Sequence, residues 1–261
     1  MTTLHDIPVA LPASPAEAVA AFGDGSGVTV IAGGTITVPE INAGRLRPAR
    51  VVLLGRAGLD GFSREGGMVR IGAACQLSAL EAAPDPLAAA AREVGDQEIR
   101  AQATLGGNLC APPADDVQGG DLRAPLIALA ARVRSAGAGG ERTEPVEDFL
   151  AAASTRLILE VEFEEPRWAG YASLHRAHAH HYTVLAVSAA ETSAGLRIAV
   201  TGAGGAGLRL RAAEASGNPA DAVGEDALGG VEFGDDALAS AWYRRRMLPV
   251  LVARALASRS S

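Results

Sequence analysis

Short apolar runs, broken by glycine, proline and charged residues, recur along the whole of this chain of 261 residues. Short runs that are rich in β-branched side chains, or that alternate apolar and polar positions, predict strands. Five stretches have this pattern: 28–31, 50–54, 68–71, 157–163 and 196–201. The stretches 126–133 and 183–190 fit a buried helix or a buried strand, because their periodicity does not separate the two.

Helix starts are marked by capping residues. Ser14 can cap a helix that has Pro15 in its first position and Glu17 placed to close a capping box, and this helix is expected to run to Phe22. In the same way, Asp85 and Pro86 predict a helix that runs to about residue 94.

A C-terminal helix is predicted over about residues 235–257, and it contains Arg244, Arg245 and Arg246. Three consecutive side chains cannot share one face of a helix. We therefore expect these arginines to lie on a solvated surface or a subunit contact rather than to form an anion site.

The order of these elements predicts an α+β protein with three parts. Residues 1–55 have a strand–helix–strand pattern typical of a small α/β unit, and residues 56–164 form a second lobe that ends in a strand. The segment 164–167, Glu-Glu-Pro-Arg, is the best candidate linker to a C-terminal domain over 165–261.

The composition excludes several classes of function. A net charge of −7, with acidic residues and arginines mixed along the chain, favours neither nucleic acid nor an anionic membrane as a partner. Cys75 and Cys110 are the only cysteines, so the chain cannot by itself ligate an iron–sulfur cluster or a structural zinc. With no leader-like start and no apolar run of about 18 to 20 residues, the chain is expected to be cytoplasmic, without membrane insertion.

Two glycine pairs are the candidate binding elements. The first lies in Ala32-Gly33-Gly34-Thr35-Ile36, directly after the predicted strand 28–31, and the second lies in Thr104-Leu105-Gly106-Gly107-Asn108. Glycine lets backbone N–H groups approach an anion closely, because no Cβ intervenes. Two such turns suit a long ligand with a central diphosphate.

On these residues the chain resembles the FAD-binding, or medium, subunits of molybdenum hydroxylases of the carbon monoxide dehydrogenase and xanthine dehydrogenase type. The family's first loop is matched by residues 32–35 and Pro39, and its second by Ile99, Arg100 and 103–109. The resemblance implies a two-lobed FAD-binding domain of the PCMH type over 1–55 and 56–164, followed by a smaller C-terminal α+β domain.

The resemblance also implies which residues bind FAD. It gives the set Ala32, Gly33, Gly34, Thr35, Ile36, Thr104, Gly106, Gly107, Asn108 and Asp121. Asp121 is chosen because Asp121-Leu122 and the apolar residues after it fit the family's spacing, with an insertion of about four residues, while Asp115 and Asp116 compete with it. No side chain is expected to act as a catalytic acid or base.

By the same resemblance, the expected function is electron transfer in a complex. A large molybdopterin subunit would oxidise the substrate, and a small iron–sulfur subunit would pass electrons to FAD here, for delivery to NAD, a quinone or oxygen. Tyr171 and Arg176 match the start of the family's C-terminal domain, whereas its Lys, second Arg and Asp fall on Ser173, Ala177 and His180. These departures support an alternative, a cofactor-free structural subunit of the same kind of complex.

Two further patterns are expected to have no binding role. Residues 202–207 satisfy G-x-G-x-x-G, but the alternation after them predicts a β-hairpin turn. His175, His178, His180 and His181 lack the spacing and the neighbouring acidic or thiol ligands of a metal site.

Overall fold

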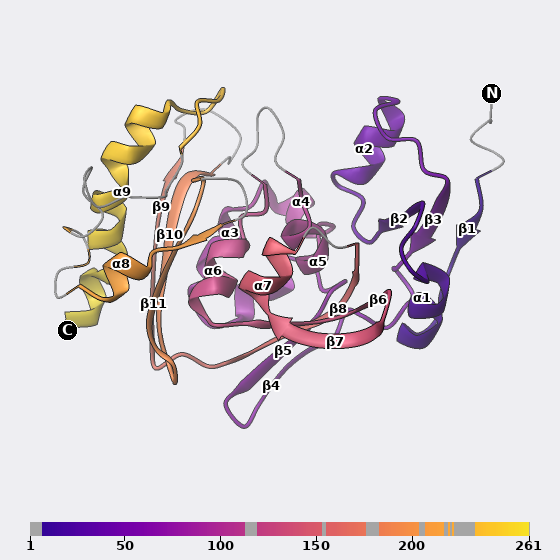
Figure 1. The fold of residues 1–261 in the computed structure, drawn as a ribbon, viewed down its shortest axis with the longest axis horizontal. Helices are drawn as coiled ribbons and strands as arrows, with labels where there is room; N and C mark the ends of the chain where they lie inside the picture. The colour runs from indigo at the N-terminus through magenta and orange to yellow at the C-terminus, as the bar shows by residue number, and fades with distance from the viewer. Residues whose placement is uncertain are drawn as a thin grey trace.

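Three β-sheets follow one another along the chain. The computed structural model describes residues 7–112, 119–152, 155–175, 183–203, 207–216, 219, 221 and 233–260. The N-terminal sheet lies at one end of the molecule and the C-terminal sheet at the other, with a five-stranded sheet between them (Figure 1). The chain is α+β, as expected.

The N-terminal unit is a small parallel sheet of order β1-β3-β2 with two helices. Its elements are β1 (Val9–Ala10), α1 (Pro15–Phe22), β2 (Val28–Ile31), α2 (Thr37–Asn42) and β3 (Arg50–Leu53). The predicted start of α1 is confirmed, because the Ser14 hydroxyl accepts a hydrogen bond from the Glu17 N–H at 3.2 Å. Ala18 and Phe22 on α1 pack against Leu157 and Leu159 of the next unit, which joins the two units by an apolar contact.

The middle unit is an antiparallel sheet of order β4-β5-β8-β6-β7, covered on one face by helices. Its strands are β4 (Phe62–Glu65), β5 (Met68–Gly72), β6 (Arg132–Gly137), β7 (Gly140–Pro145) and β8 (Leu157–Glu164). Its helices are η2 (Ala79–Ala82), α3 (Leu87–Glu93), α4 (Gln97–Arg100), α5 (Leu105–Leu109), α6 (Arg123–Ala128) and α7 (Val146–Ala151). Helix α3 begins one residue after Pro86, and Asp85 accepts a hydrogen bond from the Ala89 N–H at 3.1 Å.

The stretch 126–133, which fits either structure in the sequence, is both. It completes α6, turns at Ala130 with φ of 53°, and enters β6. Apart from the exposed Arg132, the stretch is apolar because most of its residues are buried in the same core.

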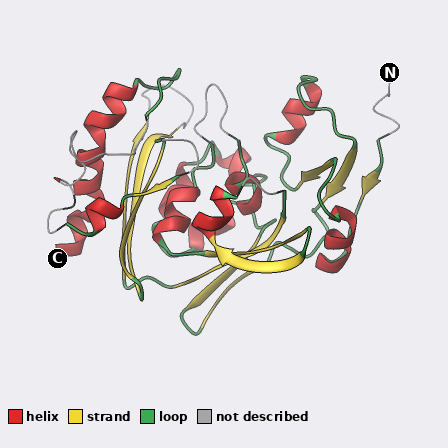
Figure 2. Cartoon of the chain, in the orientation of Figure 1, coloured by secondary structure: helices red, strands yellow, loops and turns green. Residues whose placement is uncertain are grey.

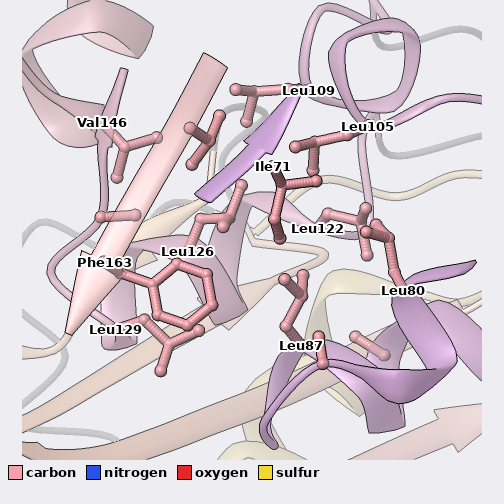
Figure 3. Close-up of a cluster of buried hydrophobic side chains, with 14 of the residues drawn as sticks. Ile71, Leu80, Leu87, Leu105, Leu109, Leu122, Leu126, Leu129, Val146 and Phe163 are labelled. Atoms are coloured by element: carbon pink, nitrogen blue, oxygen red, sulfur yellow. The ribbon is translucent and has the colours of Figure 1, made fainter. Parts of the chain in front are cut away.

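That core is built from leucines on the helices and branched or aromatic residues on the sheet. Figure 3 shows Leu87, Leu105 and Leu126 of the helices in one cluster with Ile71 and Phe163 of the sheet. The three leucines and Ile71 are less than 2% exposed. The opposite face of the sheet carries charged pairs such as Arg70–Glu162 at 3.4 Å. This period-two alternation fixes which face of the sheet holds the helices.

The C-terminal unit is an antiparallel sheet of order β12-β11-β10-β9 between two layers of helices. Its elements are β9 (Trp168–His175), β10 (Thr183–Thr192), β11 (Gly195–Thr201), β12 (Leu208–Arg209), α8 (Arg211–Glu214), α9 (Ala241–Leu256) and η4 (Ala257–Ser260). Helices α3 and α6 lie between this sheet and the middle one, while α9 covers the far side (Figure 2). The stretch 183–190, for which the sequence left helix and strand open, lies within β10 and is a strand.

Helix α9 begins six residues later than predicted. Asp235 and Asp236 lie in a turn before the helix. The Asp236 carboxylate stabilises this turn by accepting hydrogen bonds from the N–H groups of Leu238 and Ala239 at 2.9 and 3.0 Å. Ser240 then caps the helix by accepting a hydrogen bond from the Tyr243 N–H at 3.2 Å.

The expected solvated position is wrong for Arg244, although Arg245 and Arg246 are exposed. The Arg244 side chain is 0% exposed and makes two 2.7 Å bonds to the Asp236 carboxylate. It also donates to the carbonyl oxygens of Val184 and Gly234. A buried guanidinium needs partners for its donors, and here they come from the turn before the helix and from β10.

Candidate functional site

One cavity of about 590 Å³ lies where the N-terminal and middle units meet, with part of its wall from β10. This volume is within the range of small-molecule and cofactor sites. All ten residues predicted to bind the cofactor line it: Ala32, Gly33, Gly34, Thr35, Ile36, Thr104, Gly106, Gly107, Asn108 and Asp121. The structure thus brings together segments that are far apart in the sequence, while the contact of each residue with FAD stays a prediction.

The first glycine segment presents unpaired backbone donors. No described residue accepts a hydrogen bond from the N–H groups of residues 33–36. Gly34 adopts φ of +73°, in the left-handed region that favours glycine. A Cβ on Gly33 would lie 2.0 Å from the Gln102 carbonyl oxygen, so the absence of a side chain there lets this segment rest against the turn before Thr104.

The second glycine segment is a short helix rather than a loop, which corrects the expected second donor-bearing turn. Thr104 caps α5 by accepting a hydrogen bond from the Gly107 N–H at 3.2 Å. The N–H groups of Leu105 and Gly106 donate to Cys75 O and Ala73 O at 2.9 and 2.8 Å. These donors are used within the protein, so this segment shapes the cavity wall instead of offering backbone donors.

Asn108 and Asp121 form a joined polar patch on the wall. The Asn108 amide oxygen accepts a hydrogen bond from the Leu122 N–H at 3.0 Å, and its side chain also bonds the Asp121 carboxyl group. Burial raises the pKa of Asp121, and hydrogen bonds from Thr183 and Asn108 partly oppose that rise. The competing Asp115 and Asp116 lie outside the described residues.

Arg100 and Arg123 stabilise the cavity wall by hydrogen bonds to backbone carbonyl oxygens. Arg100 donates to the carbonyl oxygens of Val94 and Gly95 at 3.3 and 3.1 Å, which fixes the turn between α3 and α4 that lines the cavity. Arg123 donates to Leu109 O at 3.0 Å and to Ala111 O at 2.5 Å, at the end of α5. The motif match at Arg100 therefore reflects support of the wall.

Sequence reasoning missed Arg156, which precedes β8 and lines the cavity. Its guanidinium donates to Ser135 Oγ and Ser135 O, at 2.9 and 3.0 Å, and to Gly140 O at 2.6 Å. A cation fixed in this way favours an anionic ligand. No motif marks it, because its partners are brought near only by the pairing of β6 with β7 and β8.

A second group was also missed, a cluster of Glu93, Tyr171, Ser173 and His175. Glu93 accepts hydrogen bonds from the Tyr171 and Ser173 hydroxyls, both at 2.9 Å, and pairs with His175 Nε2 at 2.9 Å. Ser173 is the position where the resemblance led us to expect a Lys, while Ala177 and His180 lie outside the described residues. Glu93 is 78 residues from Tyr171, so no local pattern could have paired them.

The two patterns expected to be without a binding role can be checked in part. Strands β11 and β12 are antiparallel, as the hairpin interpretation of 202–207 requires, although 204–206 lie outside the described residues. Within the described part of the chain, no three His, Cys, Asp or Glu side chains are grouped to hold a metal ion. His178, His180 and His181 fall outside that part.

None of the described helices is long and apolar enough to cross a membrane.

Together these features define a protein class: a binder of an extended anionic cofactor held between an α/β unit and an antiparallel unit. Free N–H donors and Arg156 suit a diphosphate, the apolar wall at Val30, Leu54 and Leu157 suits a ring system, and Asn108 and Asp121 suit polar groups. The residues present therefore fit FAD.

Residues 5–163 match the family described as the FAD binding domain in molybdopterin dehydrogenase, and the chain belongs to this family. This confirms the predicted family, the FAD-binding fold and FAD as the cofactor of the chain. It also confirms the predicted class, an oxidoreductase of the molybdenum hydroxylase kind.

Relatives extend over most of the chain. An uncharacterised Escherichia coli K12 protein, YgfM, is 30% identical over 199 residues, which are 75% of this chain and 74% of that protein. The carbon monoxide dehydrogenase medium chain of Hydrogenophaga pseudoflava is 28% identical over 273 residues and 94% of each chain.

Solved structures agree with this assignment. The structure of the Hydrogenophaga pseudoflava carbon monoxide dehydrogenase that lacks the Mo-pyranopterin moiety superposes with a TM-score of 0.81, at 26% identity over 96% of each chain. Quinoline 2-oxidoreductase from Pseudomonas putida 86 superposes with a TM-score of 0.79 over 98% of each chain. At 21% identity, the second match shows the shared fold alone.

Proposed function

We propose that this chain is the electron-transfer flavoprotein subunit of a multi-subunit molybdenum hydroxylase. It receives electrons from iron–sulfur clusters on a partner chain and passes them to an external acceptor. The observation that carries the proposal is the single cavity in which all ten predicted FAD-binding residues meet.

In this proposal the two cavity segments have different tasks. The N–H groups of residues 33–36 hold the diphosphate of FAD, and Arg156, which also lines the cavity, adds positive charge there. Thr104, Gly106 and Gly107 form a smooth wall, and Asn108 with Asp121 holds polar groups of the cofactor. When bound, FAD supplies the capacity to collect electrons singly and to release them in pairs.

The remaining parts of the proposal concern the complex. A relative that is a medium chain of carbon monoxide dehydrogenase supports a large and a small subunit as partners. In this proposal the large subunit carries molybdopterin, the small subunit carries the iron–sulfur clusters, and the complex is cytoplasmic. Neither nucleic acid nor a membrane is a partner. We place the domain bounds at 1–55, 56–164 and 165–261, in keeping with three sheets that each have their own order.

One observation favours the alternative of a cofactor-free structural subunit. Ser173 stands where the resemblance led us to expect a Lys, and its hydroxyl is directed to Glu93. The donors of residues 33–36 argue for a retained cofactor, because these N–H groups have no acceptor among the described residues and line the cavity, where an anionic ligand can accept from them.

The test is flavin retention by the full chain. The purified protein is incubated with FAD or with FMN, desalted, and examined by visible absorption. We expect FAD to be retained and FMN to be lost. FMN has a single phosphate and lacks the AMP part of FAD, so it lacks the diphosphate that residues 33–36 hold in this proposal. A folded protein that keeps neither flavin would contradict the proposal and support the structural subunit. Equal retention of both would contradict the role given to residues 33–36.

A further inference from the structure

The cluster of Glu93, Tyr171, Ser173 and His175 has no task in the function proposed above. Tyr171, Ser173 and His175 alternate along β9, so they share one face of the sheet. Tyr171 packs against the core of the middle unit, whereas Ala172 and Leu174 pack against the core under α9. The cluster therefore faces α3, which supplies Glu93, and not α9.

This cluster lies directly behind the cavity wall. His175 is the register partner of Thr183 on β10, and Thr183 both lines the cavity and hydrogen-bonds the Asp121 carboxyl group. Glu93 immediately precedes Val94, which also lines the cavity. Both charged members of the cluster therefore adjoin residues of the cavity wall: His175 lies beside Thr183 in the sheet, and Glu93 precedes Val94 in the chain.

The charges around His175 are predominantly negative. Glu93 on α3 contacts it directly, and Asp121 before α6 acts on it through space. Tyr171 is neutral, since burial raises its pKa well above the usual value. Arg123 is held by the carbonyl oxygens of Leu109 and Ala111.

On the α9 side of the sheet, the described pair of Arg244 and Asp236, 2.7 Å apart, carries no net charge. The hydrogen bond to Glu93 raises the pKa of His175 above its ordinary value. Glu93 therefore favours the protonated form of the His175 imidazole, and the charge of Asp121 acts in the same direction.

We propose that His175, oriented by Glu93, is a positioning residue that supplies positive charge behind the cavity and so strengthens the binding of the anionic cofactor. This inference rests on the proposed binding of FAD in the cavity. Below the ordinary His pKa of about 6.5 the positive charge is fully present, and it is lost as pH rises through the raised pKa of His175. Glu93 and Asp121 then face the cofactor without it, and binding weakens.

The experiment measures FAD affinity of the full chain by flavin fluorescence quenching between about pH 6 and pH 9. For the wild type, we expect the dissociation constant to rise about three- to tenfold across this range, the size expected for one partly screened charge. His175→Gln should bind at all pH values as the wild type does at high pH. Glu93→Gln should move the transition to lower pH, because the partner that raises the pKa is gone.

Arg70→Gln is the matched control, because it removes a charge on the outer face of the middle sheet, where Arg70 pairs with Glu162. It should keep the wild-type pH profile. A flat wild-type profile, or an unchanged slope in His175→Gln, would overturn the inference. Absence of FAD binding at every pH would instead overturn the proposed function, so the two failures are distinct.

A second measurement needs no stable variant. The imidazole of His175 is titrated by NMR in the wild-type chain without and with saturating FAD. Binding of an anion favoured by the charged imidazole must raise the pKa of that imidazole by the same coupling free energy. An identical pKa in the two states would contradict the inference.

Discussion

The pairs Gly33–Gly34 and Gly106–Gly107 look alike in the sequence, yet the structure uses them differently. The first lies in a loop with free N–H groups, where Gly33 touches the Gln102 backbone and Gly34 needs a positive φ. The second lies inside α5, with the N–H groups of both glycines bonded. Gly33 and Gly34 leave backbone donors available and allow the N-terminal and middle units to approach closely. Gly106 and Gly107 place no side chain between α5 and the cavity.

This difference shows that the composition of a glycine motif does not reveal its role. What decides the role is where each N–H group finds its acceptor, and for Leu105 and Gly106 the acceptors lie on the segment 73–75 that follows β5. Substitutions in the two segments should therefore affect stability and cofactor binding in different proportions.

The largest effect is expected for Gly33→Ala. The new Cβ would lie 2.0 Å from the Gln102 carbonyl oxygen, a backbone atom that cannot rotate away. We expect a loss of about 3 kcal/mol in the free energy of unfolding, measured by urea denaturation, together with loss of FAD. Gly61→Ala, where a Cβ meets nothing within 4 Å, is the control. Wild-type stability of Gly33→Ala would show that the two segments are not in contact.

A smaller effect is expected for Thr104→Ala, which removes the cap of α5. The Gly107 N–H loses its acceptor, and the free energy of unfolding should fall by about 1 kcal/mol. Thr104→Ser keeps the hydroxyl and should recover most of that loss in the same denaturation experiment. If Ser and Ala variants were equally unstable, the lost methyl contacts rather than the cap would be responsible.

The smallest effect on stability is expected for Gly107→Ala. Within 4 Å the new Cβ meets only the Thr104 hydroxyl, at 2.9 Å, and alanine favours a helix over glycine by about 0.5 to 1 kcal/mol. The two effects should nearly cancel in the melting temperature, while FAD affinity falls because the methyl group enters the cavity. Unchanged affinity, read by fluorescence quenching, would place the cofactor away from α5.

The sequence predicted the features that depend on neighbouring residues. Ser14, Pro15 and Glu17 mark the start of α1 by local hydrogen bonds, and the strand 28–31 follows from its β-branched residues. The ten candidate binding residues came from the family resemblance, and the structure places them around one cavity. The agreements at α1 and at the strand 28–31 involve short segments whose conformation is largely set locally, whereas the contacts of the ten candidate residues with FAD stay a prediction.

The failures involve partners distant in the chain. Arg244 is buried because β10 and the turn at Asp236 supply acceptors, and no helical periodicity shows this. The Glu93 cluster forms only when α3 packs on β9. The stretch 126–133 was ambiguous because residues 126–131 are nearly all buried, which removes the polar positions that distinguish a helix from a strand.

The contact of Gly33 with Gln102 also bears on the order in which the protein is made and loaded. The donors of residues 33–36 leave the ribosome first, but the opposite wall needs residues up to Asp121, whose partner Thr183 is made later still. Cofactor loading must then follow the synthesis of about two thirds of the chain, and bound FAD stabilises the docked units by mass action. Retained flavin would thus report that a newly made chain has joined its first two units correctly.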